Sequence, residues 1–136
     1  MKELNKSSNA VYRLNYRLVI VVKYRRKVFT NDAIVERLKD FVAGVCPEYG
    51  VEVINQECGD DHLHILFSAK PSTDICKFIN IVKGHSSRMI RKEFRDHISD
   101  KLWGDSFWSP SYYLSTVGNT SINTIYKYIE SQRTEK

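Results

Sequence analysis

Residues 51–69 read VEVINQECGDDHLHILFSA. Two β-prone runs, 51–57 and 62–69, lie on either side of a Gly-Asp-Asp break. In the second run every other residue from Leu63 to Phe67 is large and apolar, which is the period of a strand with one buried face. Gly and Asp are residues that a tight hairpin turn favours. The stretch therefore predicts two antiparallel strands joined by a short turn.

A helical pattern flanks this hairpin on each side. Upstream, apolar residues recur at helical spacing over 31–45, where Asn31 or Asp32 can cap the first turn. Downstream, a longer helical pattern begins between residues 72 and 74 and reaches about Ile98. We therefore expect one helix before the hairpin and one after it.

Two further strands and a last helix complete the pattern. Residues 11–24 alternate with a period of two and predict a long first strand. Residues 112–117 are β-prone and predict a fourth strand, and residues 121–132 predict a final helix. The order is β-α-β-β-α-β with an added C-terminal helix. The simplest closure is an α+β, ferredoxin-like (RRM-like) sandwich, in which the first and third strands are central neighbours and both internal helices cover one face.

Length and composition favour one globular domain over residues 1–136. Hydrophobic residues make up 42% of the chain, which excludes a disordered protein. The net charge of +5 favours a polyanionic partner without proving one. The three cysteines are widely spaced and predict neither a disulfide framework nor a zinc site. With no signal peptide and no apolar run long enough to span a membrane, a cytoplasmic location is expected.

A histidine pair opens the third predicted strand. Alternation places His62 and His64 on one face and Leu63 on the other, so the pair should lie on the open face, away from the helices. Two imidazoles at such positions can bind one cation if a third ligand is present. A lone His-x-His on a strand is more often structural. The preceding Asp61 is expected to form the turn or to orient a ligand, not to bind the metal itself.

The final helix holds a second candidate group. Helical geometry places Tyr126 inside an apolar stripe with Ile125 and Ile129, so it predicts a core position for Tyr126. Tyr128 lies about 100° from the centre of that stripe, and Gln132 follows one turn later on the same side. A phenol and an amide could thus face a metal or a phosphate together. The alternative is an exposed tyrosine beside a solvated glutamine.

Taken together, these groups resemble the HUH superfamily, and more closely the TnpA-type single-tyrosine transposases of the smallest bacterial insertion sequences. The likeness covers nearly the whole chain. It comprises YRLV at 16–19, KYRRK at 23–27, DHLH at 61–64, KG at 83–84, SSR at 86–88, LW at 102–103, WSPSYY at 108–113, VG at 117–118 and YIESQ at 128–132.

The resemblance implies a specific function. Tyr128 would be the nucleophile, and Gln132 would join His62 and His64 as a ligand of Mg²⁺ or Mn²⁺, of which Mn²⁺ suits imidazole better. The enzyme would cleave and rejoin single-stranded DNA through a 5′-phosphotyrosine link and recognise hairpins near the ends of its element. It would act as a homodimer, in which each active site can combine the histidines of one subunit with the tyrosine of the other.

Basic residues supply candidate phosphate contacts in two groups, one after the first strand and one on the second helix. They are Lys23, Arg25 and Arg26, followed by Lys83, Arg88 and Arg91. Aromatic residues could stack on unpaired bases, although core packing is at least as plausible for the tryptophans. These are Tyr24, Trp103, Trp108, Tyr112 and Tyr113. His85 is expected to be a plain surface residue of the helix.

Three rival functions are open to the sequence. A palindrome-associated, host-adopted relative often carries a longer C-terminal tail, whereas this sequence ends four residues after Gln132. A rolling-circle nickase or relaxase of the same superfamily is typically larger. A non-catalytic single-strand-binding module would have no need for both the histidine pair and Tyr128. The single-tyrosine transposase is therefore favoured.

Overall fold

The structure is a computed structural model that describes residues 6–7, 10–11, 13–101, 106–118 and 122–132. Its elements in chain order are β1 (Lys6–Ser7), β2 (Ala10–Val11), β3 (Leu14–Val21), η1 (Lys23–Arg25), α1 (Asp32–Val45), η2 (Cys46–Tyr49), β4 (Val51–Cys58), β5 (His62–Ala69), α2 (Ile75–Glu93), α3 (Arg95–Ile98), β6 (Tyr113–Thr116) and α4 (Ile122–Ser131). The predicted Trp103 stacking site lies outside the described residues.

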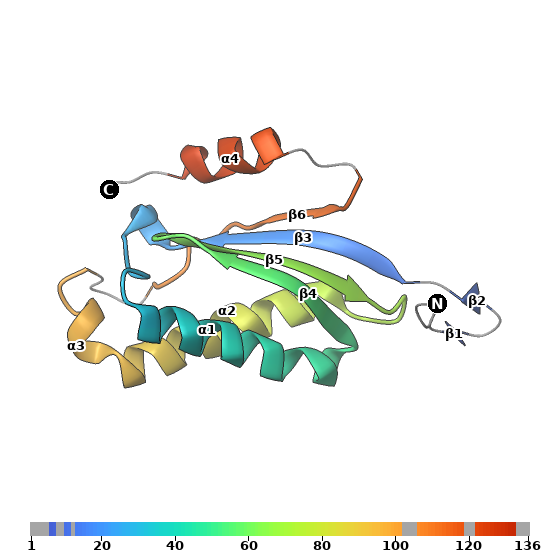
Figure 1. The fold of residues 1–136 in the computed structure, drawn as a ribbon, viewed down its shortest axis with the longest axis horizontal. Coiled ribbons are helices and arrows are strands. Elements are labelled where there is room, and N and C mark those ends of the chain that lie inside the picture. The colour runs from blue at the N-terminus through green and yellow to red at the C-terminus, as the bar shows by residue number, and fades with distance from the viewer. Residues whose placement is uncertain (1–5, 8–9, 12, 102–105, 119–121, 133–136) are drawn as a thin grey trace.

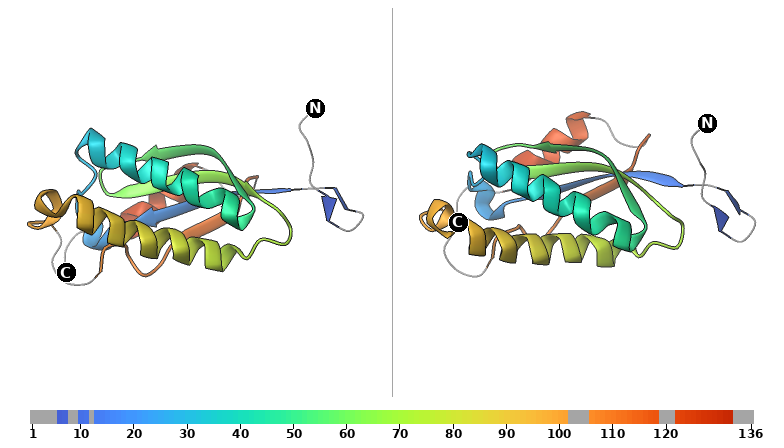
Figure 2. Two further views of the ribbon diagram at one scale, coloured as in Figure 1. Left: turned by 90° about the horizontal axis from the view of Figure 1, so that it is seen from below. Right: turned by 60° about the horizontal axis from the view of Figure 1, so that its bottom comes forward.

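The main sheet has the strand order β4-β5-β3-β6, and every neighbouring pair is antiparallel. The first and third predicted strands, β3 and β5, are therefore the central neighbours, as the sequence predicts. α1 and α2 lie side by side under the sheet, and α4 lies on its other face (Figures 1 and 2). This is the predicted α+β sandwich with an added C-terminal helix. Among the described residues, no helix combines the length and apolarity needed to cross a membrane.

The helix starts follow the predicted caps, but the second helix is divided in two and β3 (Leu14–Val21) is shorter than the strand predicted over 11–24. The Asn31 side chain accepts a hydrogen bond from the amide of Ala33 at 2.7 Å and so caps α1. The predicted helix to Ile98 breaks at Phe94, whose φ of −125° leaves the helical region while its ring packs against the core. The first strand ends at Val21, and the chain then turns through η1.

The core lies mainly between the sheet and the helices α1 and α2. Leu63, Ile65 and Phe67 of β5 are fully buried there, as their alternation predicts. A second, smaller cluster forms on the other face, where α4 packs on β3. Its buried members are Val19, Val21, Ile125 and Ile129. The expectation of an open sheet face is therefore wrong, because the apolar residues of α4 need a surface to cover.

Phe67 makes the strongest stability prediction. Its ring is fully buried and lies 5.4 Å from that of Tyr16 and 5.3 Å from that of Phe78. We expect Phe67→Ala to lower the free energy of unfolding by about 3–5 kcal/mol, because a cavity replaces the ring. Urea denaturation measures this loss. Ile54→Ala, at a side chain that is 51% exposed, is the control, and equal losses in both variants would contradict the packing described here.

Candidate active site

The histidine pair lies at the first residues of β5, on the face that α4 covers. His62 and His64 sit opposite Val21 and Val19 of β3 in the antiparallel register. Both valines belong to the small cluster under α4. The side chains of His62 and His64 are only 23% and 11% exposed. The pair is thus a partly enclosed site and not an open patch.

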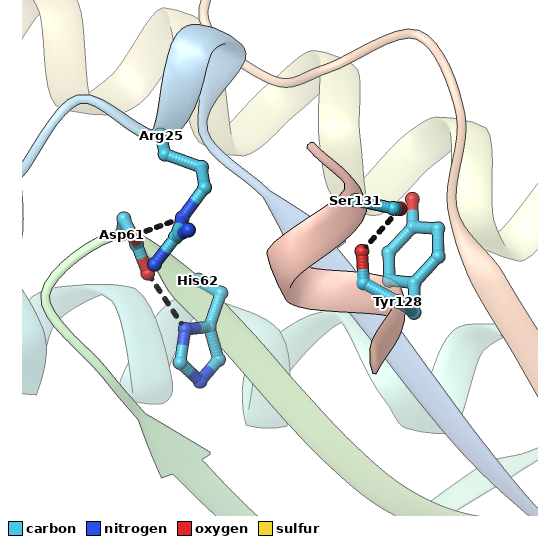
Figure 3. Close-up of polar contacts among 5 residues, drawn as sticks. All are labelled: Arg25, Asp61, His62, Tyr128 and Ser131. Atoms are coloured by element: carbon cyan, nitrogen blue, oxygen red, sulfur yellow. Dashed lines mark hydrogen bonds and ion pairs between the residues drawn. The ribbon is translucent and has the colours of Figure 1, made fainter. Parts of the chain in front are cut away.

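A chain of polar contacts holds His62 (Figure 3). Its Nδ1 lies 2.8 Å from one carboxylate oxygen of Asp61, and the other oxygen accepts a hydrogen bond from Arg25 Nε at 3.0 Å. Burial alone would raise the pKa of Asp61, but the hydrogen bonds from His62 and Arg25 outweigh it and lower that pKa. The carboxylate is therefore ionised near neutral pH. Of the two roles predicted for Asp61, forming the turn or orienting a ligand, these contacts support the second.

The ring nitrogens of His64 have weaker partners than Nδ1 of His62. Its Nδ1 lies 3.8 Å from a carboxylate oxygen of Glu57, and its Nε2 is buried without a hydrogen-bond partner among the described residues. Burial, and secondly the positive charge of Arg17, lowers the pKa of His64. The ring is therefore neutral at pH 7 and keeps one lone pair. A buried polar atom without a partner is costly unless it has a ligand.

These features fit a divalent cation. A neutral imidazole with an unpartnered nitrogen is a suitable metal ligand, and so is an imidazole whose Nδ1 is bound to a carboxylate. His62 and His64 would hold the ion together. Across the residues that the structure describes, no group of three or more His, Cys, Asp or Glu side chains could hold a metal ion. The predicted third ligand, Gln132, is an amide.

The backbone of η1 carries the Arg25 side chain to this site. Tyr24 and Arg25 have φ values of +60° and +54°. Two consecutive left-handed residues without a glycine cost about 1–2 kcal/mol each. The turn is held by hydrogen bonds of 2.8 Å from the Arg25 amide to the Val22 carbonyl and from the Val22 amide to the Asp61 carbonyl. The strained turn and the start of β5 are therefore fastened together.

Tyr128 lies on α4, half-buried against the β6 side of the sheet. Its ring is 5.7 Å from that of Tyr113, and its hydroxyl is 2.8 Å from the hydroxyl of Ser111. Burial raises the pKa of the Tyr128 phenol, and the hydrogen bond with Ser111 partly opposes that rise. The phenol is therefore neutral in the ground state near pH 7.

Gln132 shares this environment one turn later. Its Oε1 accepts hydrogen bonds from Ser109 at 2.8 Å and from Ser111 at 3.4 Å. Ser111 thus contacts both Tyr128 and Gln132, which lie on the same side of the helix as predicted. Ser109 and Ser111 form a pair that we call the serine shelf.

The buried face of α4 differs from the predicted one. Tyr126 is 58% exposed and Ile122 is 50% exposed, so the prediction of a core position for Tyr126 is wrong. The buried side consists of Ile125, Ile129 and the half-buried Tyr128 and is centred near Ile125, which is a rotation of roughly 60° at 100° per residue. The cause is tertiary, because Tyr113 and the serine shelf offer partners to Tyr128.

Within one chain, Tyr128 and the histidine pair lie on opposite sides of β3. The histidines are on β5, whereas Tyr128 packs on Tyr113 of β6. Neighbouring strands are about 4.8 Å apart, so β5 and β6 are separated by about 10 Å. In Figure 3 the Tyr128 ring lies on the side of α4 that faces away from His62. The structure therefore does not bring the predicted nucleophile and the histidines of one chain together.

The six predicted phosphate contacts have four different environments. Arg88 is exposed, whereas Arg25 is bound to Asp61. Lys23 and Arg26 lie over the ring of Tyr24, at 5.3 and 5.8 Å from its centroid.

Lys83 and Arg91, both on α2, face the segment that precedes β6. Lys83 Nζ donates to the backbone carbonyls of Ser109 and Pro110 at 2.9 and 3.2 Å. Arg91 lies 6.0 Å from the centroid of the Phe107 ring. Lys83 therefore holds the backbone of the serine shelf from its position on α2.

Trp108 and His85 each lie in an environment that the sequence predicted as one possibility. Trp108 is 6% exposed, packs against Phe29 and Phe107, and donates a hydrogen bond from Nε1 to Ser86 at 3.0 Å, so it belongs to the core. His85 is exposed, as expected. The stacking role considered for Trp108 is therefore excluded by its burial.

Sequence reasoning missed the serine shelf and the position of Arg17. Ser109 and Ser111 are spaced by two residues beside a predicted strand, a signal that could have placed both hydroxyls on one face. Arg17 lines a small cavity next to His64, together with Asn55, Glu57, Leu66 and Ile122. Its place beside His64 depends on the pairing of β3 with β5, which no local pattern specifies.

Known proteins with similar sequences are transposases. The family model described as "Transposase IS200 like" matches residues 10–132. The chain is 38% identical over 130 residues to the ISDra2 transposase TnpA of Deinococcus radiodurans, covering 96% of this chain and 91% of that one. It is 31% identical over 120 residues to the transposase for insertion sequence element IS200 of Salmonella typhimurium, covering 88% and 77%.

A solved structure supports the same relationship. A crystal structure of a Deinococcus radiodurans R1 chain named as a transposase superposes with a TM-score of 0.85 at 32% sequence identity. The superposition covers 96% of this chain and 98% of that one. The superposed region therefore includes the sheet and both covering helices.

Proposed function

Because the chain belongs to the IS200-like transposase family, we propose that it cleaves and rejoins single-stranded DNA with Tyr128 as the nucleophile. DNA transposition is the activity of the family. The observation that carries the finer proposal is the pair of unusual side chains on one sheet face. His64 has a buried, unpartnered Nε2 beside His62, and Tyr128 presents a half-buried phenol on α4.

The chemistry follows from these groups. The Tyr128 oxygen attacks the phosphorus, the bond to the 3′ oxygen breaks, and the products are a 5′-phosphotyrosine link and a free 3′-hydroxyl. The phenolic proton is lost and the departing oxygen gains one. Since the link keeps the energy of the phosphodiester, a 3′-hydroxyl can reverse the attack and rejoin the DNA without ATP.

A bound Mg²⁺ or Mn²⁺ would polarise a non-bridging phosphate oxygen and orient the scissile phosphate. In our proposal His62 and His64 hold this ion, and Gln132 is its third protein ligand. Gln132 must then exchange its hydrogen bonds with the serine shelf for the cation. Lys23, Arg26 and Arg88 are proposed to contact the phosphates of a DNA hairpin.

We propose that a homodimer completes each site. The side of α4 that carries Tyr128 faces away from His62 of its own chain, which supports attack on DNA bound at the histidines of a second copy. A symmetric dimer would then contain two identical composite sites.

The test is an adduct assay with the wild-type protein. Labelled strands copied from the DNA around its gene, including any hairpins, are incubated with Mn²⁺, with Mg²⁺ or with a chelator and then run on a denaturing gel. We expect a covalent band only with single strands and a divalent metal, and a polymerase-extendable 3′ end on the released strand. If binding persists but no strand is cut, the chain is a non-catalytic single-strand-binding module.

Ser111 predicts a pH effect on this reaction. Its hydroxyl lowers the pKa of Tyr128, so Ser111→Ala should raise that pKa further. A higher pKa leaves less phenolate at any given pH, so the cleavage rate at pH 7–8 should fall by roughly 3–10-fold, the value of one hydrogen bond. Single-turnover rates measured from pH 6 to 10 should rise with pH and be displaced to higher pH in the variant.

The control for this prediction is Ser87→Ala. The Ser87 hydroxyl bonds only the Gly84 carbonyl of its own helix, at 2.9 Å, among the described contacts. Its profile should coincide with that of the wild type. A Ser111→Ala profile that also coincides with the wild type would exclude a role of Ser111 in tuning the phenol.

A further inference from the structure

We propose that Arg25 is a positioning residue for metal binding, which acts through Asp61 to fix the tautomer of His62. This inference rests on the proposed function, since it concerns the cation assigned there to His62 and His64. It departs from the expectation that Arg25 contacts DNA phosphates. In this role Arg25 touches neither the cation nor the DNA.

The hydrogen bonds specify which nitrogen of His62 is free. Arg25 Nε donates to Asp61 Oδ2 at 3.0 Å, and Asp61 Oδ1 lies 2.8 Å from His62 Nδ1. An ionised carboxylate only accepts hydrogen bonds, so Nδ1 must carry the proton. In the tautomer with the proton on Nδ1, the lone pair is on Nε2, where a cation can bind.

Burial makes Arg25 necessary to this arrangement. The Asp61 side chain is only 8% exposed, so water does little to hold its orientation. With each carboxylate oxygen bound to one partner, the Asp61 plane is fixed from both sides. Without Arg25, Oδ2 would lack its charged donor, and the carboxylate could rotate. That rotation would release His62 Nδ1.

The backbone of η1 supports the same assignment. Arg25 adopts a left-handed conformation immediately after Tyr24 does, and neither is a glycine. Such strain persists only where the surrounding structure fixes it. The turn directs the Arg25 guanidinium back over the start of β5, where Figure 3 shows it against Asp61. The basic neighbours Lys23 and Arg26 lie instead over the ring of Tyr24.

The experiment measures Mn²⁺ affinity by calorimetry in the absence of DNA. Arg25→Gln and Asp61→Asn should each raise the Kd about 10–100-fold, the usual cost of losing a group that orients a metal ligand. Arg25→Lys, which keeps the charge, should raise the Kd for Mn²⁺ by a smaller factor. The control is Arg37→Gln, which removes an Arg–carboxylate pair of 2.8 Å with Glu93 between α1 and α2 and should leave the Kd unchanged.

A second readout needs no metal. Long-range ¹H–¹⁵N spectra of the metal-free wild type should show His62 protonated at Nδ1 and not at Nε2. Arg25→Gln should shift His62 towards a mixture of tautomers while the protein stays folded. A purely structural role of Arg25 would lower the Tm without changing the tautomer.

The outcomes separate this inference from the proposed function. Arg25→Gln with the wild-type tautomer and a Kd within about twofold would overturn the inference, as would a loss confined to DNA affinity. If the wild type binds no Mn²⁺, the metal in the proposed function is wrong. The tautomer spectra then still decide whether Arg25 fixes His62.

Discussion

Tyr128→Phe is expected to abolish the covalent protein–DNA adduct and to lower strand cleavage by roughly 10³-fold or more, because no other group replaces the nucleophilic oxygen. The variant keeps the ring that packs against Tyr113 and loses only the hydrogen bond with Ser111, so it should remain folded. Its DNA affinity should be close to that of the wild type. The adduct gel and a binding titration measure the two quantities on the same substrate.

Tyr126→Phe is the matched control for this experiment. Tyr126 lies on the same helix, but it is 58% exposed and on the side away from the buried face. It should form the adduct at the wild-type rate. An adduct that persists in Tyr128→Phe and disappears in Tyr126→Phe would show that the nucleophile has been placed on the wrong side of α4.

The second large effect concerns which chain supplies each group of the active site in the proposed dimer. His64→Ala and Tyr128→Phe should each be inactive alone. When the two variants are co-expressed with different tags and purified as a heterodimer, one composite site should contain an intact histidine pair and an intact tyrosine. We expect adduct formation at about half the wild-type level, since one of two symmetric sites is complete.

This result depends on the separation of the two groups in one chain. The histidines lie on β5 and Tyr128 packs over β6, with β3 between them. A heterodimer that forms but makes no adduct would mean that α4 carries Tyr128 across β3 within its own chain. A wild-type protein that stays monomeric on a sizing column with DNA would contradict the dimer itself.

The serine shelf contacts both candidate residues at the C-terminal end of α4, Tyr128 and Gln132. Ser109 and Ser111 hold Gln132 and Tyr128 on the sheet, and Lys83 binds the backbone carbonyl of Ser109 from α2. The proposed ligand Gln132 and the proposed nucleophile Tyr128 are thus oriented by one short segment before β6. For Gln132 to bind a cation, these contacts must exchange, so the shelf and the metal compete for the same amide oxygen.

Much of the fold followed from local patterns. The hairpin of β4 and β5 was predicted with the right boundaries at His62 and Ala69, because strict alternation and a Gly-Asp turn are local signals. A cap of α1 at Asn31 or Asp32 was predicted for the same reason, and Asn31 forms it. The break at Phe94 was missed, because the helical pattern continues through it and only the packing of Phe94 against the core interrupts the helix.

The sequence alone determined the order of the elements, the common face of His62 and His64, and the pairing of Tyr128 with Gln132, since each depends on backbone periods of 2 or 3.6 residues. Only the tertiary structure decided which side of α4 is buried, because partners from β6 and the serine shelf set that choice. It also decided that Arg25 meets Asp61 and that β3 separates Tyr128 from the histidines. Contacts between segments far apart in the chain leave no periodic signal in the sequence.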